Sequence, residues 1–211
     1  MAGRFITFEG GEGSGKSTQI RILGERLHAA GRVVRLTREP GGTPEGEAVR
    51  SLLVSGDVGS WTARAEALLN YAAREQHLMQ VIRPVLAGGA IVLCDRFMDS
   101  TRAYQGHAGG CGMAFIDGLE HEIVGATRPD LTLIFDLDPE AGLKRARERG
   151  DGLAEDRYER KGSAFHQKLR QGFLAIAQAE PGRCRVIDAS AGIDAVAGEV
   201  WRHVSTAIGH G

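Results

Sequence analysis

The sequence predicts an α/β fold, with a mostly parallel sheet of five strands and helices on both faces. Five short apolar runs recur along the 211 residues, and segments with helical spacing separate them. Runs that are nearly continuous in hydrophobicity are typical of strands buried on both faces. Strands that alternate with helices favour a parallel sheet covered by those helices. The length suits a single domain spanning residues 1–211.

The expected elements follow one another along the chain. Strands are expected in "RFITFEG" (4–10), "RVVRLTRE" (32–39), "AIVLCDR" (90–96), "DLTLIFDLD" (130–138) and "RCRVIDAS" (183–190). Helices are expected at residues 15–30, 62–87, 139–149, 160–180 and 192–208, from their apolar periodicity and from the proline that starts the third. The charged, glycine-containing segment 148–162 interrupts two helical patterns, and we expect a mobile lid there. Ligands of such folds lie beyond the carboxyl ends of the strands, so functional residues are expected directly after each strand.

Charge and cysteine content exclude several classes of protein. The formal net charge is −1, so nothing global indicates binding to nucleic acid or to a membrane surface. The three cysteines, Cys94, Cys111 and Cys184, are odd in number and form no CxxC pair, which argues against a disulfide framework or a zinc site. No targeting segment and no apolar run of membrane-spanning length is evident, so a reducing cytoplasm is the expected location.

A glycine-rich motif follows the first expected strand. Gly10, Gly15, Lys16 and Ser17 fit the pattern GxxxxGK[ST] between a strand and a helix, which is the context that the motif requires. Glycines let backbone N–H groups point inward at a helix N-terminus and form an anion nest. The lysine then reaches the β- and γ-phosphates, and the serine hydroxyl is available to Mg²⁺. The motif therefore predicts a nucleoside triphosphate with Mg²⁺, although it does not separate kinases from hydrolytic switches.

Glu12 is unusual inside this loop, because a carboxylate is repelled by a bound triphosphate. It would be tolerated if it faced a hydroxyl or a cation on a second partner, or if it pointed to solvent at a loop tip.

Candidate residues for a second substrate follow the second strand. Glu39 ends that strand, and Arg50 lies on the helical turn after the loop "PGG". In the long expected helix, Asn70 and Tyr71 precede Arg74 by four and three residues, spacings that bring side chains together on a helix. A tyrosine beside an arginine could stack on a base and hold a phosphate or a carbonyl. The alternative is a core tyrosine and a solvent-exposed arginine.

A third group of candidates follows the third strand. Asp95 ends the strand, where a Walker-B carboxylate would orient Mg²⁺ through water, and Arg96 comes next. A short, helical turn then carries four hydrogen-bonding side chains, Ser100, Thr101, Tyr104 and Gln105. Glutamine offers both a donor and an acceptor, which suits an imide-like base edge.

Six segments together resemble one family. They are "FEGGEGSGKST", "TREPGGTPEGEAVR", "YAAREQH", "CDRFMDSTRAYQG", "RPDLTLIFDLDPEAGLKRARERG" and "DRYERKGSAFHQKLRQGF", in that order. The chain resembles the bacterial thymidylate kinases, the dTMP kinases of the P-loop nucleoside monophosphate kinase group, from about Arg4 to about Ser190. The resemblance implies a P-loop kinase fold in a single domain with a lid at about 148–162, ATP and Mg²⁺ as cofactors, and a homodimer through helices that include 62–87.

The resemblance also implies roles for individual residues. The phosphates of ATP would be held by Gly10, Gly11, Glu12, Gly13, Ser14, Gly15, Lys16, Ser17 and Thr18, with Ser17 and Asp95 at the metal. The dTMP site would contain Glu39, Arg50, Asn70, Tyr71, Arg74, Arg96, Ser100, Thr101, Tyr104 and Gln105. Within it, Arg96 would bind the phosphate, Gln105 the thymine edge, and Tyr104 would close against the deoxyribose.

Two features of the sequence are best understood by comparison with the family: the residue at position 70 and the lack of a basic residue in the glycine-rich loop. Many relatives carry an aromatic residue at position 70 that stacks on thymine; here Asn70 stands there, so either Tyr71 takes over or the stacking is weaker. The glycine-rich loop has no basic residue at its variable positions, and in such relatives the lid supplies the missing cation. Arg149 and Arg157 are the expected catalytic pair, alongside Lys16, Arg96 and Glu12.

The expected reaction is ATP + dTMP → ADP + dTDP, in dTTP biosynthesis. Alternatives are a kinase for another acceptor, such as dUMP or a deoxynucleoside, and an ATP-dependent switch or assembly protein. The arginine-rich loops after the strands argue against a switch, because a switch has no need of a second anion site.

Overall fold

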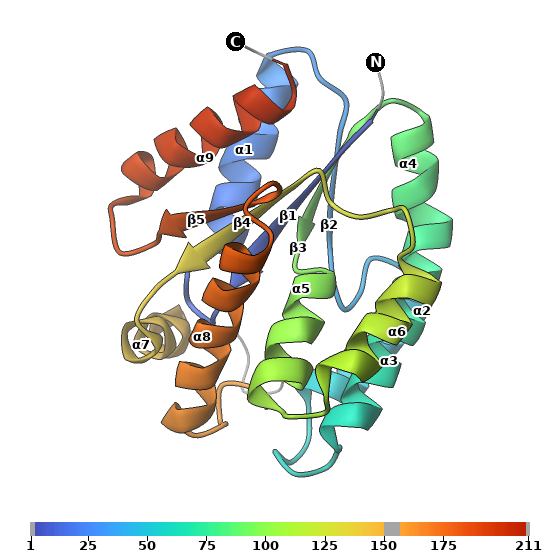
Figure 1. The fold of residues 1–211 in the computed structure, drawn as a ribbon. Coiled ribbons are helices and arrows are strands. Elements are labelled where there is room, and N and C mark those ends of the chain that lie inside the picture. The colour runs from blue at the N-terminus through green and yellow to red at the C-terminus, as the bar shows by residue number, and fades with distance from the viewer. Residues whose placement is uncertain (1–2, 150–156, 210–211) are drawn as a thin grey trace.

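A computed structural model of the chain describes residues 3–149 and 157–209. Its centre is a five-stranded, wholly parallel sheet in the order β2-β3-β1-β4-β5. The strands are β1 (Arg4–Gly10), β2 (Val34–Arg38), β3 (Ile91–Asp95), β4 (Leu131–Asp136) and β5 (Cys184–Asp188). All five expected strands are present, each within two residues of the expected bounds at either end. The predicted α/β fold with a parallel five-stranded sheet is therefore confirmed (Figure 1).

Helices cover both faces of the sheet (Figure 1). Helices α1 (Lys16–Ala29) and α9 (Ile193–Ala207) pack on one face, where Leu27 and Val204 join a core with Ile6 and Leu133 of the strands. The other face is covered by α3 (Ala63–His77), α6 (Met113–Ile123) and α8 (Ser163–Ala179). The remaining helices are α2 (Pro44–Val54), α4 (Arg83–Ala87), α5 (Met98–Thr101) and α7 (Pro139–Arg149).

Alternation along β4 shows why both faces are apolar. Leu131, Leu133 and Phe135 belong to the core beneath α1 and α9, whereas Ile134 belongs to the core beneath α8. Successive side chains of a strand point to opposite faces, so a strand buried on both sides has few polar positions. Thr132 is one of them, and its hydroxyl meets that of Thr7 at 2.8 Å within the sheet.

Several helical regions differ from the sequence expectation, and helix α2 is one that was not expected. The helix expected at 62–87 is a continuous run that contains a π-helical segment, η1 (Leu78–Ile82), between α3 and α4. A second π-helical segment, η2 (Arg102–Ala108), extends α5 beyond the short turn that was expected. Helix α6 was not expected, because a glycine-rich stretch directly precedes its apolar residues.

The strand register brings the functional loops together. Phe8 of β1 and Arg38 of β2 both pair with Asp95 of β3, and Gly10 pairs with Phe135 of β4. The carboxyl ends of these four strands therefore meet at one edge. Cys94 and Cys184 are buried, Cys111 is partly buried, and none of the three is in a disulfide. Among the described residues, no helix combines the length and the apolar character that crossing a membrane requires.

Candidate active site

The glycine-rich loop joins β1 to α1 and surrounds the amine of Lys16. Gly13 and Gly15 have positive φ angles of 66° and 86°, which glycine adopts without the strain of a side chain. The Nζ atom of Lys16 donates to Gly10 O at 3.2 Å and to Gly11 O at 2.8 Å. Burial and then Arg96 lower the pKa of Lys16 to about 8, against the opposing effect of nearby carboxylates. The amine of Lys16 is thus held at the N-terminus of α1. The charge of this amine and the N-terminus of the helix both favour a bound anion.

The loop packs tightly against α7 through a second glycine. A Cβ atom at Gly142 would lie 2.4 Å from Glu12 O, and one at Gly13 would lie 1.9 Å from Gly142 O. Both positions therefore require glycine for the loop to keep its place. Sequence reasoning missed Gly142, because nothing in the local pattern of α7 marks it as a contact of a loop 130 residues away.

An oxygen pair lies beside Lys16. The hydroxyl of Ser17 donates to Asp95 Oδ2 at 2.7 Å. A hydroxyl and a carboxylate are the hard oxygen donors that Mg²⁺ prefers in nucleotide sites, where phosphates and water complete its coordination. The described residues contain no group of three or more His, Cys, Asp or Glu side chains placed to hold a metal by themselves. The donors at Ser17 and Asp95 fit a metal that is bound together with a nucleotide.

Arg96 links the glycine-rich loop to the chain after β3. It is held at a φ of 66°, and its guanidinium donates to Gly10 O at 2.8 Å and to Glu12 Oε1 at 3.0 Å. The Tyr104 hydroxyl donates to the same Glu12 oxygen at 2.5 Å. Burial would raise the pKa of Glu12, but Arg96, Lys16 and Tyr104 lower it to about 2. The carboxylate that was unexpected in the loop therefore binds a cation and a phenol.

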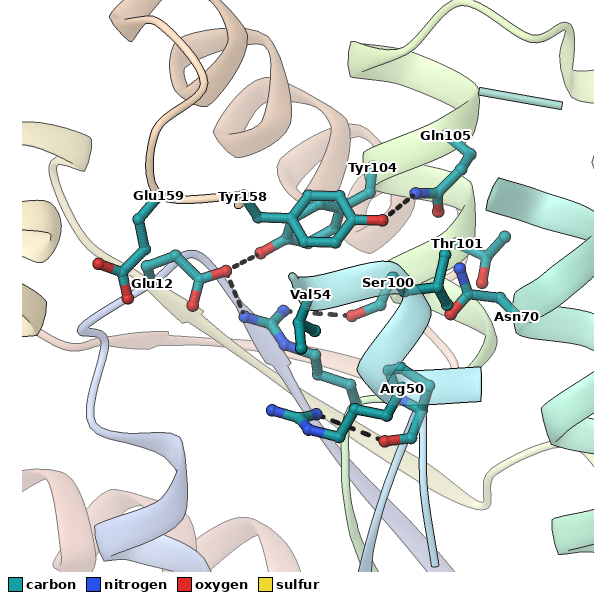
Figure 2. Close-up of a pocket in the computed structure, with 13 residues that line it drawn as sticks. Glu12, Arg50, Val54, Asn70, Ser100, Thr101, Tyr104, Gln105, Tyr158 and Glu159 are labelled. Carbon is teal, nitrogen blue, oxygen red and sulfur yellow. Dashed lines mark hydrogen bonds and ion pairs between the residues drawn. The ribbon is translucent and has the colours of Figure 1, made fainter. Parts of the chain in front are cut away.

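Two neighbouring cavities meet at this ion pair, and Figure 2 draws the residues that line the first of them. The first, of about 110 Å³, is lined by Glu12, Pro40, Arg50, Leu53, Val54, Asn70, Arg96, Ser100, Thr101, Tyr104, Gln105, Tyr158 and Glu159. The second, of about 190 Å³, is lined by residues 12–17, Arg38, Glu39, Arg50, Asp95 and Arg96. Glu12, Arg50 and Arg96 line both cavities, so a ligand in one would lie next to a ligand in the other.

The first cavity is lined by Arg96 and by six other residues that the sequence predicted for a second substrate. It is also lined by several residues that the sequence analysis did not identify. Leu53 and Val54 follow Arg50 by three and four residues on α2, a spacing that would have indicated them had that helix been predicted. Tyr158 and Glu159 lie within the segment 148–162 that was expected to form the lid, and no local signal marks them as cavity residues.

A larger hollow lies on the other side of the glycine-rich loop. It has a volume of about 580 Å³ and is lined by Gly13, Ser14, Gly15, Thr18, Gln19, Arg145, Glu148, residues 189–193 and Val196. Arg145 donates to Ala189 O at 3.0 Å and thereby joins α7 to the loop after β5. The loop that is built for phosphates thus lies between this hollow and the two smaller cavities.

Tyr71 lines neither the first nor the second cavity. This corrects the expectation that Tyr71 takes over from the aromatic residue that many relatives carry at position 70. It is buried in the core beneath α3 and α6, with the Arg74 guanidinium 4.5 Å from its ring centroid. Asn70 lines the cavity instead, and its amide donates to Glu66 O at 2.8 Å. Consecutive helical residues point about 100° apart, so only one of the two can face the cavity.

Arg74 and Glu39 form a buried pair, and neither of them lines the first cavity, although Glu39 lines the second. Arg74 Nε donates to Glu39 Oε2 at 2.8 Å, and Nη2 donates to the Thr101 hydroxyl at 3.1 Å. His77 Nδ1 lies 2.9 Å from the other oxygen of Glu39. Among the described residues, the buried Nη1 of Arg74 has no hydrogen-bond partner. One strong donor therefore remains available beside Thr101.

Arg157 lies away from the glycine-rich loop, and this contradicts its expected catalytic role. Its side chain is 0% exposed, and its guanidinium binds the carboxylate of Glu66 and the carbonyl oxygens of Leu53 and Asp57. A guanidinium committed to these acceptors in the interior cannot also reach a phosphate. The residues 150–156 of the expected lid and the side chain of Arg149 lie outside the described part of the chain.

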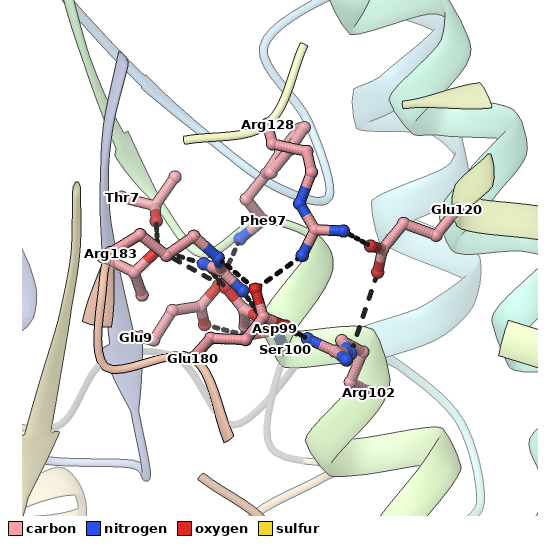
Figure 3. A network of polar contacts seen from close by, with 11 residues as sticks. Thr7, Glu9, Phe97, Asp99, Ser100, Arg102, Glu120, Arg128, Glu180 and Arg183 are labelled. Carbon is pink, nitrogen blue, oxygen red and sulfur yellow. Dashed lines mark hydrogen bonds and ion pairs between the residues drawn. The ribbon is translucent and has the colours of Figure 1, made fainter. Parts of the chain in front are cut away.

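A buried charge network supports the Arg96 loop from behind (Figure 3). Glu9 accepts hydrogen bonds from Phe97 N at 2.8 Å, from Ser100 N at 3.2 Å and from the Ser100 hydroxyl at 2.6 Å. Nearby, Asp99 is fully buried and receives two hydrogen bonds from Arg183, at 2.7 and 2.8 Å. Burial, and then Asp99, raise the pKa of Glu9 to about 8. The strand before the glycine-rich loop thereby fixes the turn that carries Arg96.

Gly142→Ala should displace the glycine-rich loop, because the new methyl group would meet Glu12 O at 2.4 Å. Overpacking of this kind costs about 1–3 kcal/mol, and we expect the KM for ATP to rise while the fold is retained. Steady-state kinetics with ATP as the varied substrate measures the effect. Gly198→Ala is the matched control, since a Cβ at Gly198 in α9 meets nothing within 4 Å. Equal KM values for the two variants would contradict the contact.

The free energy of unfolding should respond to pH through Glu9. A carboxyl whose pKa is raised from 4.5 to about 8 by folding contributes stability below the lower value, and this contribution is lost as the pH rises through the higher one. Glu9→Gln keeps the acceptor oxygen and a donor toward Ser100 but cannot ionise. We expect its stability relative to wild type to increase between pH 5 and pH 8 in urea unfolding experiments. Glu25→Gln, in an exposed pair with Arg21, is the control; a gap that does not change with pH would contradict the shift.

Comparison with known proteins agrees with this site. The sequence model of the thymidylate kinase family matches residues 8–200. A thymidylate kinase of Caulobacter vibrioides is 59% identical over 194 residues, which cover 92% of both chains. One of Nitrobacter winogradskyi is 54% identical over 94% of this chain and 86% of that protein.

A solved structure is similar over almost the whole chain. The crystal structure of thymidylate kinase from Ehrlichia chaffeensis superposes with a TM-score of 0.78 at 36% identity, covering 97% of this chain and 99% of that one. With a glycine-rich loop, a second cavity that shares Arg96 with the cavity of that loop, and this degree of similarity, the chain belongs to the thymidylate kinase family.

Proposed function

We infer that this chain transfers the γ-phosphoryl group of ATP to dTMP, giving ADP and dTDP, the step that leads toward dTTP. The observation that carries this inference is the arrangement of two cavities around one ion pair. Arg96 and Glu12 line both the cavity of the glycine-rich loop and the cavity that contains Gln105. Two nucleotides bound there would place their phosphates next to each other, as phosphoryl transfer between them requires.

We propose that Mg²⁺ accompanies ATP and is held by Ser17 and, through water, by Asp95. The 2.7 Å contact between these two side chains supports the proposal. The metal would supply positive charge that neutralises the negative charge on the phosphates during the transfer. Gly10–Thr18 would bind the phosphates through backbone N–H groups, with Lys16 supplying a fixed positive charge.

For the acceptor, we propose that dTMP occupies the cavity shown in Figure 2. Arg96 and Arg50 would bind its phosphate. Gln105 would meet the N3 position of the thymine, beside Ser100 and Thr101, and the unpartnered Nη1 of Arg74 is the nearest buried donor for a base carbonyl. Asn70 in place of an aromatic residue removes a stacking contact that is worth about 1–3 kcal/mol at other nucleobase sites. Tyr104 would pack against the deoxyribose, where a 2′-hydroxyl would be crowded.

The chain supplies positive charge and geometry rather than a strong base. The attacking group is a phosphate oxygen that is already negative, so the obstacle is the repulsion between two polyanions. Lys16 and Arg96 offset that repulsion in a site preorganised before the substrates arrive. Glu12, with its pKa lowered to about 2, stays ionised at neutral pH and fixes the position of Arg96.

A cation from the expected lid remains part of the proposal. Arg149 is the remaining candidate, because Arg157 is bound to Glu66 in the interior. Closure of a lid over the phosphates would also exclude water, which would otherwise compete with dTMP for the phosphoryl group.

We also propose that the protein acts as a cytoplasmic homodimer. Leu68 in α3 and Met79 in η1 are 51% and 55% exposed, although both are large apolar side chains. Apolar surface of this kind on one helical run supports contact with a second copy. Measurement of the molar mass in solution would decide the oligomeric state.

The proposed reaction predicts that dTMP controls the release of ADP. In a coupled assay with ATP and Mg²⁺, we expect rapid ADP release with dTMP, slower release with dUMP and little with thymidine or without an acceptor. Slow hydrolysis that does not depend on any acceptor would instead indicate an ATP-dependent switch. A preference for dUMP or for a deoxynucleoside would identify a different kinase.

Arg96→Ala should lower kcat/KM for dTMP by roughly 10²–10³-fold, as the loss of a preorganised charge does at other active sites. Removing the guanidinium takes away the group that both cavities share and leaves Glu12 with only the Tyr104 hydroxyl and Lys16 for support. Arg21→Ala is the control, because Arg21 forms an exposed pair with Glu25 on α1. Near-normal turnover of dTMP by the Arg96 variant would refute the role.

A further inference from the structure

Glu66 is a buried carboxylate that the proposed reaction does not use. It lies on α3, and only 1% of the residue is exposed. One oxygen binds the guanidinium of Arg157 and lies 3.6 Å from Lys161 Nζ. The other accepts hydrogen bonds from Gln105 Nε2 at 2.7 Å and from the Tyr158 hydroxyl at 3.0 Å. We call Glu66 and these four partners the Glu66 cluster.

Within the cluster, the amide nitrogen of Gln105 is fully engaged. Besides its bond to Glu66, Nε2 donates to the Tyr158 hydroxyl at 3.3 Å, an interaction that can be followed in Figure 2. An amide nitrogen has two hydrogens, and the Tyr158 hydroxyl uses its own hydrogen to reach Glu66. Both hydrogens of the amide are therefore engaged by acceptors of the protein and are not available to a ligand. Among the described residues, none donates to the remaining atom, Gln105 Oε1.

The orientation of the amide follows from chemistry and does not depend on how its two ends are assigned. An ionised carboxylate has acceptor oxygens only, so the end of the amide that faces Glu66 must be the nitrogen. Turning the amide over would place the Gln105 oxygen against Glu66 Oε2 in the interior, and that carboxylate oxygen would keep only the Tyr158 hydroxyl as a donor. Two acceptors in buried contact repel each other, so this orientation is unfavourable.

We propose that Glu66 is a specificity-determining residue, which acts by holding Gln105 so that the cavity contains an acceptor and not a donor. The proposal rests on the function inferred above, in which Gln105 meets position N3 of the base. Thymine and uracil carry a hydrogen on N3 and can donate it to Oε1. Cytosine has an unprotonated N3, so its lone pair would face the lone pairs of Oε1. Glu66 touches no substrate in this arrangement and acts through Gln105.

The same cluster accounts for Arg157 and Lys161. A carboxylate buried without a cation would be strongly destabilising. Arg157 supplies that cation and also binds the end of α2 through Leu53 O at 2.7 Å. The described part of the expected lid is thereby tied to α2, which lines the cavity.

The test is the ratio of kcat/KM for dTMP to kcat/KM for dCMP. Glu66→Gln alone leaves two cations without their counter-charge, so the informative variant is the double change Glu66→Gln with Lys161→Met. The control is Lys161→Met alone, which removes the same cation and leaves Glu66 in place. Methionine suits this position, since Lys161 Nζ lies over the rings of Phe165 and Tyr158 at 4.5 and 5.0 Å.

We expect the control to keep the wild-type ratio and the double variant to lower it by about tenfold to a hundredfold, because a glutamine at position 66 accepts either orientation of Gln105. A purely structural role would lower turnover of both substrates together and leave the ratio unchanged. A folded double variant whose ratio stays within threefold of the control would overturn the proposal. Thermal unfolding of each variant establishes that it is folded.

A neutron diffraction structure of the wild-type protein with dTMP provides a second test that needs no variant. Deuterons of the Gln105 amide directed at Glu66 and Tyr158 would support the proposal, and a deuteron directed at the base would overturn it. Failure of the proposed function is distinguishable from either result, because it would appear as a wild-type protein that does not release ADP in response to dTMP.

Discussion

The ion pair between Arg96 and Glu12 is the interaction on which the site depends. Glu12 belongs to the loop after β1 and Arg96 to the loop after β3, and the two strands are neighbours in the sheet. The pair lies where the two cavities meet, and it places one positive and one negative charge between two sites that are both built for anions. Because Arg96 also donates to Gly10 O, the guanidinium joins the phosphate loop to the acceptor side as one unit.

Behind this pair, the fold buries several acidic side chains that accept hydrogen bonds from other parts of the protein. Glu9 and Asp99 are both fully buried, and each receives several hydrogen bonds from backbone, hydroxyl or guanidinium groups. Glu39 and Glu66 are buried beside arginines in the same way. Three of these carboxylates hold a residue that lines a ligand cavity. Glu9 holds the turn that carries Arg96, and Glu66 binds Gln105. Glu39 binds Arg74, which in turn donates to Thr101. Rigid polar contacts thus hold the flexible side chains in position before a ligand binds.

Local patterns predicted the parts of the site that are contiguous in sequence. The glycine-rich loop, Ser17, Asp95 and Arg96 could be identified because each stands at the end of a recognisable strand, and parallel strands end at one edge. Predictions that depended on the direction of a side chain were less successful. Tyr71 is in the core and Asn70 faces the cavity, since neighbouring helical residues differ by about 100° and sequence spacing alone does not say which face is buried. Arg157 was expected at the phosphates but lies in the interior, where it binds Glu66. Sequence patterns could not reveal this pairing, because the two residues are 91 positions apart.

By itself, the sequence determined the fold class, the order of the strands along the chain and the phosphate-binding chemistry, since these follow from short-range periodicity and from one motif with a fixed spacing. Only the tertiary structure decided which residues share a cavity, which carboxylate neutralises which arginine, and why Gly142 must lack a side chain. The physical reason is that a buried charge, a hydrogen bond and a steric contact all depend on distances between residues that are remote in the chain. Those distances exist only after the sheet and the helices have packed together.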